Sequence, residues 1–155
     1  DSYDIVSLTY DSNTVDIVYA SHVLEYFDRE EARNILKEWI RVLKPKGVLR
    51  LAVPDFKTMS FLYTSGTVSL KEILGPMYGK IKMGNKYIYH KTVYDYDSLK
   101  KLLEELNLKK VKIYDWRKTD HSKYDDQSQA YYPHMDKENG TLISLNIEGV
   151  KWKKH

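Results

Sequence analysis

Two segments place polar side chains directly after an apolar, β-branched run. Residues 15–20 (VDIVYA) are followed by Ser21 and His22, and residues 48–53 (VLRLAV) by a proline and then Asp55. An imidazole titrates near neutral pH, so a histidine at a strand end can serve as a general base. A carboxylate there can bind a substrate or cap the next helix. His22 can also simply hydrogen-bond a loop. A chemical role and a structural role therefore stay open for each of the two residues, His22 and Asp55.

A helix between these two runs would position them. Asp28 followed three residues later by Glu31 is typical of a capping box, and the helix must end near Leu43 because Pro45 disfavours a helical residue before it. The inward face is predicted to consist of Ala32, Ile35, Leu36, Trp39, Ile40 and Leu43. Strand, helix and strand in this order predict two parallel strands, whose carboxyl ends form the edge where ligands bind.

The rest of the chain completes one α/β domain over residues 1–155. Residues 55–94 are interpreted as a helical and loop insertion, followed by a helix whose inward leucines are Leu99, Leu102, Leu103 and Leu106. A strand over 109–116 should bury Val111 and Ile113, with Tyr114 as a further option. Residues 117–139 form a long polar loop, and 141–150 a last strand. We expect the two C-terminal strands to pair antiparallel.

Several polar residues outside the first strand ends are further site candidates. His121 and His134, like His22, could accept a proton from a substrate hydroxyl. Substrate-binding candidates are Asp55, His90, Asp126 and Gln129. The histidine and carboxylate spacing matches no strong metal signature, so no metal ligand is predicted, although a metal-dependent hydrolase stays a weaker alternative. A solvated loop is the plain alternative for residues 117–139.

Composition narrows the class of protein. The net charge of +3, from 25 basic and 22 acidic residues, is too small and too dispersed to predict nucleic-acid binding. No cysteine is present, which excludes disulfides and thiolate metal sites. No apolar run is long enough to span a membrane, and the N-terminal residues lack a signal pattern. A cytoplasmic protein acting on a small molecule is expected.

The residues described above resemble class I S-adenosylmethionine-dependent methyltransferases. The similar part runs from DIVSLTYDSNTVDIVYASHVLEYF (4–27) through RVLKPKG to LRLAVPDF (49–56), and corresponds to the third to fifth strands of that family. The segment HSKYDDQSQAYYPHMDKENGTLISLNIEGV (121–150) is similar to a group of predicted methyltransferases associated with bacterial cell-surface polysaccharides. The resemblance implies a Rossmann-like fold and methyl transfer from S-adenosylmethionine to an oxygen or nitrogen, with a saccharide as one candidate acceptor.

The resemblance also implies roles for single residues. Asp4 would lie near the adenine amino group and Ile5 beside the ring. Ser21 and His22 would line the methionine end of the cofactor and the entrance for substrate. Relatives commonly carry a second histidine where this chain has Tyr26, so a two-histidine arrangement at that position is not expected.

The family's glycine-rich cofactor loop has no counterpart here. The first glycine is Gly47, and none of the seven glycines forms a G-x-G pair. We therefore expect an N-terminally truncated domain that begins at the end of the third strand. The alternative to an enzyme is a non-catalytic half-domain that binds a partner, or forms a homodimer through an unpaired sheet edge.

Overall fold

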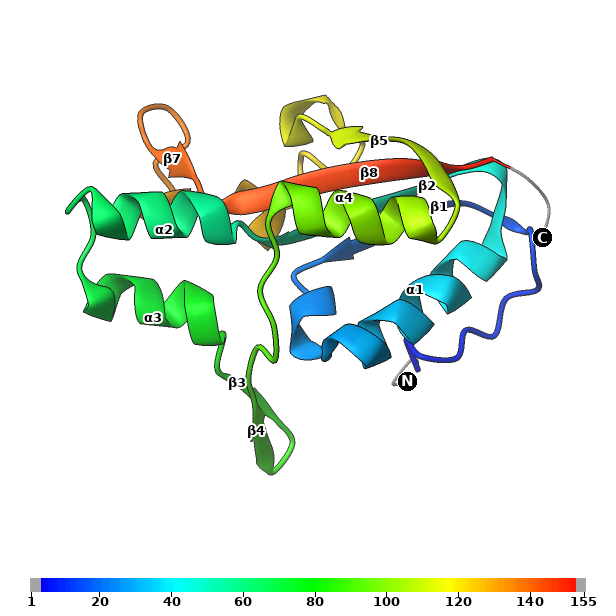
Figure 1. The fold of residues 1–155 in the computed structure, drawn as a ribbon, viewed down its shortest axis with the longest axis horizontal. Helices are drawn as coiled ribbons and strands as arrows, with labels where there is room; N and C mark the ends of the chain where they lie inside the picture. The colour runs from blue at the N-terminus through cyan, green and yellow to red at the C-terminus, as the bar shows by residue number, and fades with distance from the viewer. Residues whose placement is uncertain (1–3, 153–155) are drawn as a thin grey trace.

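A computed structural model describes residues 4–152, which form a four-stranded mixed sheet with helices against it (Figure 1). The strand order is β1-β2-β8-β5. Strand β1 (Val15–Ser21) runs parallel to β2 (Leu43–Pro54), as expected. Strand β8 (Ser144–Lys151) is antiparallel to both β2 and β5 (Leu108–Ile113). The predicted pairing of parallel and antiparallel strands is confirmed.

Helix α1 (Arg29–Val42) and helix α4 (Tyr96–Glu105) form the core together with β2 and β8. The capping box of α1 is present, with Asp28 accepting from the backbone of Glu30 and Glu31. Asp95 caps α4 in the same way. All six residues predicted for the inward face of the first helical segment are buried, since their helical spacing places them on one side.

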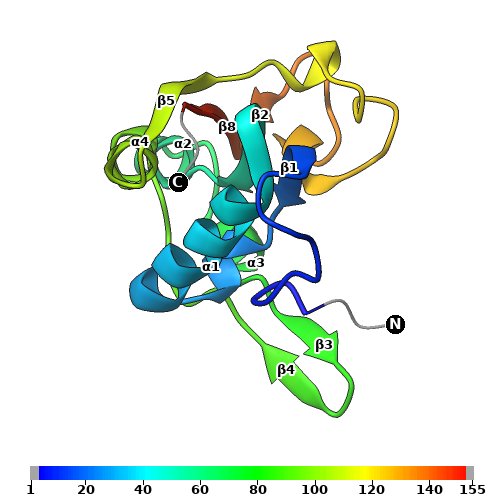
Figure 2. The same cartoon turned by 90° about the vertical axis from the view of Figure 1, so that its right-hand side faces the viewer.

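Residues 55–94 leave the sheet and return to it. They contain α2 (Phe56–Thr64), α3 (Leu70–Tyr78) and a hairpin of β3 (Ile81–Met83) and β4 (Lys86–Ile88). The hairpin projects away from the sheet in both views (Figures 1 and 2). The segment rejoins the core at Tyr94, which forms an isolated bridge with Asp55.

Short 3-10 turns and two short strands lie in the connections between the main elements. The 3-10 turn η1 (Leu24–Tyr26) follows β1, and η2 (Trp116–Lys118) and η3 (Gln127–Gln129) lie in the polar segment after β5. Strands β6 (Tyr131–Tyr132) and β7 (Thr141–Leu142) pair with each other. A small second cluster of Tyr114, Trp116 and Tyr131 packs this segment down. Tyr131 therefore holds the polar segment against the body of the molecule, whereas many other side chains of residues 117–139 are exposed.

Two sequence expectations differ from the structure. The second strand begins at Leu43 and contains a bulge, because Val15 pairs with Leu43 and Ile17 with Val48. A Cβ on Gly47 would lie 2.8 Å from the Lys44 carbonyl oxygen, so the backbone is tightly folded at this glycine, inside the strand.

Ile113 was expected to be buried and is 60% exposed. The register of β5 against β8 shifts between Lys109 and Lys112, which breaks the simple alternation of side chains along this edge strand. Val111 and Tyr114 are buried as expected. Within residues 4–152, no helix is long and apolar enough to cross a membrane.

Candidate active site at the carboxyl ends of β1 and β2

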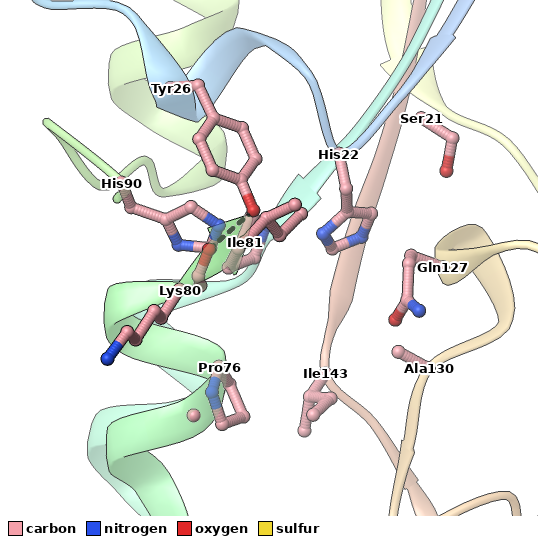
Figure 3. Close-up of a pocket in the computed structure, with 13 residues that line it drawn as sticks. Ser21, His22, Tyr26, Pro76, Lys80, Ile81, His90, Gln127, Ala130 and Ile143 are labelled. Carbon is pink, nitrogen blue, oxygen red and sulfur yellow. Dashed lines mark hydrogen bonds between the residues drawn. The ribbon is translucent and has the colours of Figure 1, made fainter. Parts of the chain in front are cut away.

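A cavity of about 660 Å³ opens at the carboxyl ends of β1 and β2. Ser21 and His22 reach it from β1, and Pro54 from β2. The α3 and β3 segment closes one side, and the polar segment with Gln127 closes another (Figure 3). The two strand ends therefore meet at one edge, as the strand, helix and strand order predicts. The cavity is formed by parts of the chain that are far apart in sequence.

His22 is held in place by a chain of hydrogen bonds that ends on the backbone. Its backbone φ is 51°, and its Nε2 lies 3.0 Å from Ser144 Oγ. The Ser144 hydroxyl donates to Asn146 Oδ1 at 2.9 Å, and Asn146 Nδ2 donates to the Ser128 carbonyl at 2.9 Å. A carbonyl only accepts, which fixes the direction of the chain. Ser144 therefore accepts from Nε2, which carries a proton in this arrangement.

Glu25 is the charged group behind His22. Its side chain is fully buried, and Oε1 lies 3.2 Å from His22 Nδ1 and 3.7 Å from His90 Nε2. Neither carboxylate oxygen has another hydrogen-bond donor among the described residues. An unpaired charge is costly in the interior. Glu25 Oε1 can accept a hydrogen bond from His22 Nδ1 when that nitrogen carries the ring proton.

His90 contributes a second imidazole from the segment after β4. Its Nδ1 lies 3.1 Å from the Met77 carbonyl oxygen and donates to it. Burial lowers the pKa of His90, with Glu25 acting in the opposite direction. The ring is therefore neutral near pH 7 and turns Nε2 toward Glu25. His22 and His90, which stand 68 positions apart in the sequence, therefore lie on either side of Glu25.

Tyr26 fixes the α3 end of the cavity. Its hydroxyl donates to the Gly79 carbonyl oxygen at 2.6 Å, and its ring meets the His90 ring edge-on with centroids 4.7 Å apart (Figure 3). Burial raises the pKa of Tyr26. The hydroxyl therefore stays protonated and keeps donating, so Tyr26 makes a structural hydrogen bond at this end of the cavity.

His121 lies in a different cluster, away from the lining of the cavity. Its ring stacks on Tyr19 with centroids 3.8 Å apart, and its Nδ1 is 3.8 Å from Asp126 Oδ2. Both ring nitrogens are buried without a hydrogen-bond partner among the described residues, and burial lowers the pKa of His121. Asp126 accepts from the Tyr19 hydroxyl at 2.6 Å and caps η3. His134 is exposed.

Other candidates lie outside the lining. Asp55 caps α2 by accepting from Thr58, so it takes the capping role. Gln129 is buried and donates to the carbonyls of Ser122 and Tyr124 while accepting from Lys137. For substrate binding, only His90 of the four candidates lines the cavity.

Asp4 and Ile5 also lie outside the cavity lining. Asp4 is exposed and accepts from the Val6 backbone at 2.9 Å. The Ile5 carbonyl accepts from Trp39 Nε1 at 2.9 Å, which ties this segment to α1. Their proposed place beside an adenine stays a prediction.

Sequence reasoning missed Glu25 and Ser144. Glu25 stands three residues after His22, a spacing that could have indicated a carboxylate partner. Ser144 begins a strand far away in sequence, so only the topology brings it to His22. Within residues 4–152, no three His, Cys, Asp or Glu side chains are grouped so that they could hold a metal ion.

Comparison with known proteins agrees with this architecture. A family described as a methyltransferase domain matches residues 2–51, which include β1, Ser21, His22 and α1. No curated protein matches the chain.

Solved structures resemble the chain over nearly its whole length. A Haloferax volcanii methyltransferase solved with the activator Trm112 is 15% identical (TM-score 0.53), covering 98% of this chain and 60% of its own. A SAM-dependent methyltransferase from Thermotoga maritima is 14% identical (TM-score 0.56), and the match covers 95% of this chain and 61% of the Thermotoga chain. A SAM-dependent methyltransferase from Methanosarcina mazei is 17% identical (TM-score 0.53), and the match covers 96% of this chain and 65% of the Methanosarcina chain. The chain thus has the α/β fold of class I methyltransferases and spans less than two thirds of each of these chains.

Proposed function

We propose that the cavity at the ends of β1 and β2 serves methyl transfer from S-adenosylmethionine to an oxygen or nitrogen of an acceptor molecule. The observation that carries this proposal is the position of Ser21 and His22. They lie at the carboxyl end of β1, next to the parallel strand β2, in a methyltransferase fold and inside the matched residues 2–51. Ligands of open α/β sheets bind at this edge.

The residues present are compatible with this cofactor. The Ser21 hydroxyl is buried without a hydrogen-bond partner among the described residues, and the cavity of about 660 Å³ has the size of a small-molecule site. Ser21 and His22 would contact the methionine end of the cofactor, and Asp4 and Ile5 the adenine. When bound, S-adenosylmethionine supplies a methyl group on a sulfonium, which is a good leaving group.

The chain's own contribution would be positioning and proton transfer. Of the three candidate bases, only His22 lines the cavity, and Glu25 lies 3.2 Å from its Nδ1. As general base, His22 would use Nε2 in the tautomer that keeps its proton on Nδ1 beside Glu25, and the acceptor hydroxyl would then replace the Ser144 hydrogen bond to Nε2 and transfer its proton there. Catalysis would otherwise rest on alignment of the reacting groups.

A saccharide or another hydroxyl-bearing small molecule is the acceptor that we propose. His90, Lys80 and Gln127 surround the cavity and offer donors and acceptors to hydroxyl groups. We also propose that β1 can pair with a second copy of the chain. The support is that, within residues 4–152, β1 has a strand partner on one side only.

Calorimetry with S-adenosylmethionine tests the proposed function. We expect saturable binding by the 155-residue chain, and loss of at least about tenfold in affinity on Ser21→Leu, because the larger side chain fills the cavity edge. Ser7→Leu is the matched control, since Ser7 is exposed and outside the cavity. No saturable binding, or equal binding by both variants, would refute the proposal.

A further inference from the structure

Residues 56–89, from the start of α2 to just past β4, carry most of the exposed apolar side chains of the described chain. Ten of the 17 large hydrophobic residues that are exposed belong to this segment. They include Leu70, Leu74 and Tyr78 on α3, and Ile81, Met83 and Tyr87 on the hairpin. Exposed apolar residues concentrated in this way mark an interaction surface. We call residues 56–89 the docking segment.

The docking segment is also strongly basic. It contains five lysines, no arginine, no aspartate and a single glutamate, giving a net charge of +4. The other 121 residues contain 20 basic and 21 acidic residues, for a net charge of −1. The five lysines are Lys57, Lys71, Lys80, Lys82 and Lys86. All five are exposed, and no ion pair within residues 4–152 involves any of them.

The shape of the segment presents these side chains outward. The β3 and β4 hairpin projects from the body of the molecule in both views (Figures 1 and 2), and α2 and α3 lie on the side away from the two termini (Figure 1). In the hairpin Ile81 pairs with Ile88 and Met83 with Lys86, so these residues share one face. An apolar groove of about 320 Å³ runs between α2 and α3.

We propose that the docking segment binds the surface of an anionic lipid bilayer. Segments that bind at a membrane interface typically combine lysines with tyrosines and aliphatic side chains. The lysine ammonium groups reach the lipid headgroups, and the other side chains lie between them. The positive segment would be drawn to anionic lipids, and the rest of the molecule, with its slight negative charge, would face away from them.

Two other kinds of partner fit less well. Protein interfaces are enriched in arginine and depleted in lysine, whereas every basic residue of the docking segment is a lysine. A nucleic acid would use the charge and the aromatic rings, but it offers nothing to Leu70, Leu74, Ile81 or Met83.

Membrane binding would bring the cavity close to the bilayer. Gly79, Lys80 and Ile81 belong to the docking segment and also line the cavity at the ends of β1 and β2. A molecule held at the membrane surface would therefore have a short path to that cavity. Binding to lipid itself does not depend on the proposed methyl transfer, so the two can fail separately.

Vesicle co-sedimentation of the full chain tests the proposal. Vesicles of phosphatidylcholine mixed with phosphatidylglycerol should bind the protein, and vesicles of phosphatidylcholine alone should not. Replacing Lys80, Lys82 and Lys86 together by Gln should lower the partition coefficient about a hundredfold, at about fivefold per lysine. The matched control replaces Lys101, Lys109 and Lys118 by Gln; these are exposed lysines outside the segment. It should bind nearly as the parent chain does.

The apolar contribution is tested separately. Met83→Ser and Tyr87→Ser remove exposed side chains without changing the charge, and each should weaken vesicle binding about tenfold. An acidic macromolecule would be the partner instead if soluble polyglutamate bound as tightly as the anionic vesicles and both serine variants left binding unchanged. That result, or absence of vesicle binding at low salt, or equal loss in the two lysine variants, would overturn the proposal.

Discussion

At the scale of single residues, Glu25 is the buried carboxylic acid group behind the cavity. It is fully buried between His22 and His90, and its carboxylate has no other donor among the described residues. Breaking a buried ion pair from one side leaves an uncompensated group and an empty volume. The carboxylate and the volume of the Glu25 side chain therefore both matter for folding as well as for chemistry.

Glu25→Ala should lower the free energy of unfolding by about 3 to 5 kcal/mol. Glu25→Gln keeps the volume and should cost less than half as much. Urea denaturation measures both, and Glu30→Ala, at an exposed position on α1, is the control expected to change stability by less than about 0.5 kcal/mol. A change in Glu25→Ala as small as in the control would show that the pair with His22 is not formed.

His121 should make stability depend on pH. Burial lowers its pKa, Arg50 acts in the same direction, and Asp126 opposes both. Below about pH 6.5, His121 therefore binds a proton more readily in the unfolded chain than in the folded chain. The free energy of unfolding consequently falls as pH falls. His90, whose pKa is also lowered, adds a contribution of the same sign.

His121→Phe tests this dependence, because it keeps a ring against Tyr19 and removes the titrating group. Urea midpoints at about pH 7.5 and about pH 5.5 should differ less in the variant than in the parent chain. His134→Gln, at an exposed position, should leave the difference unchanged. A pH dependence that survived intact in His121→Phe would assign it to other groups.

At the scale of the elements, Gly79 controls how the segment after α3 meets the site. It ends α3 with φ +49°, and a Cβ there would lie 1.9 Å from His90 Nε2. His90 has little freedom to move, since its other nitrogen is bonded to Met77 and its ring packs on Tyr26. Gly84, at the hairpin tip, has φ +59° and open space around it.

Gly79→Ala should therefore be much more damaging than Gly84→Ala. The second change should cost about 1 kcal/mol, for backbone strain alone. The first adds the clash and should displace His90 or the hairpin, so that trypsin cleaves after Lys80, Lys82 or Lys86 several times faster. Urea denaturation and the rate of limited proteolysis measure the two effects. Equal behaviour of the two variants would mean that the His90 packing does not constrain the hairpin.

The regular elements follow from sequence pattern, whereas the irregular ones depend on contacts made elsewhere. Helix α1 was predictable because Asp28, Glu31 and the apolar spacing all indicate the same helix. The bulge at Gly47 and the register shift before Lys112 were not, because pairing with β1 and β8 creates them. For the same reason the site was predicted only in part: Ser21 and His22 follow a recognisable strand, while Ser144 reaches His22 only through the antiparallel return of β8.

At the scale of the whole molecule, the two edges of the sheet are built differently. The β5 edge carries Lys109, Lys110 and Lys112 and a shift in register, both of which discourage pairing with another strand. The β1 edge carries Asp16, which is paired with Lys44, and Ile17, which is 45% exposed. Within residues 4–152 the β1 edge is therefore the one open to a further strand.

This asymmetry predicts concentration-dependent self-association of the 155-residue chain through β1. Ile17→Lys places a charge at the open edge and should shift the association to at least about tenfold higher concentration, because a lysine facing another strand must be desolvated. Ile113→Lys is the matched control: Ile113 is a more exposed isoleucine on the opposite edge strand, so it should leave association unchanged. Sedimentation velocity over a concentration series measures both. A chain that stays monomeric throughout, or one whose association responds equally to the two lysines, would exclude pairing through β1 and leave that edge as an ordinary surface.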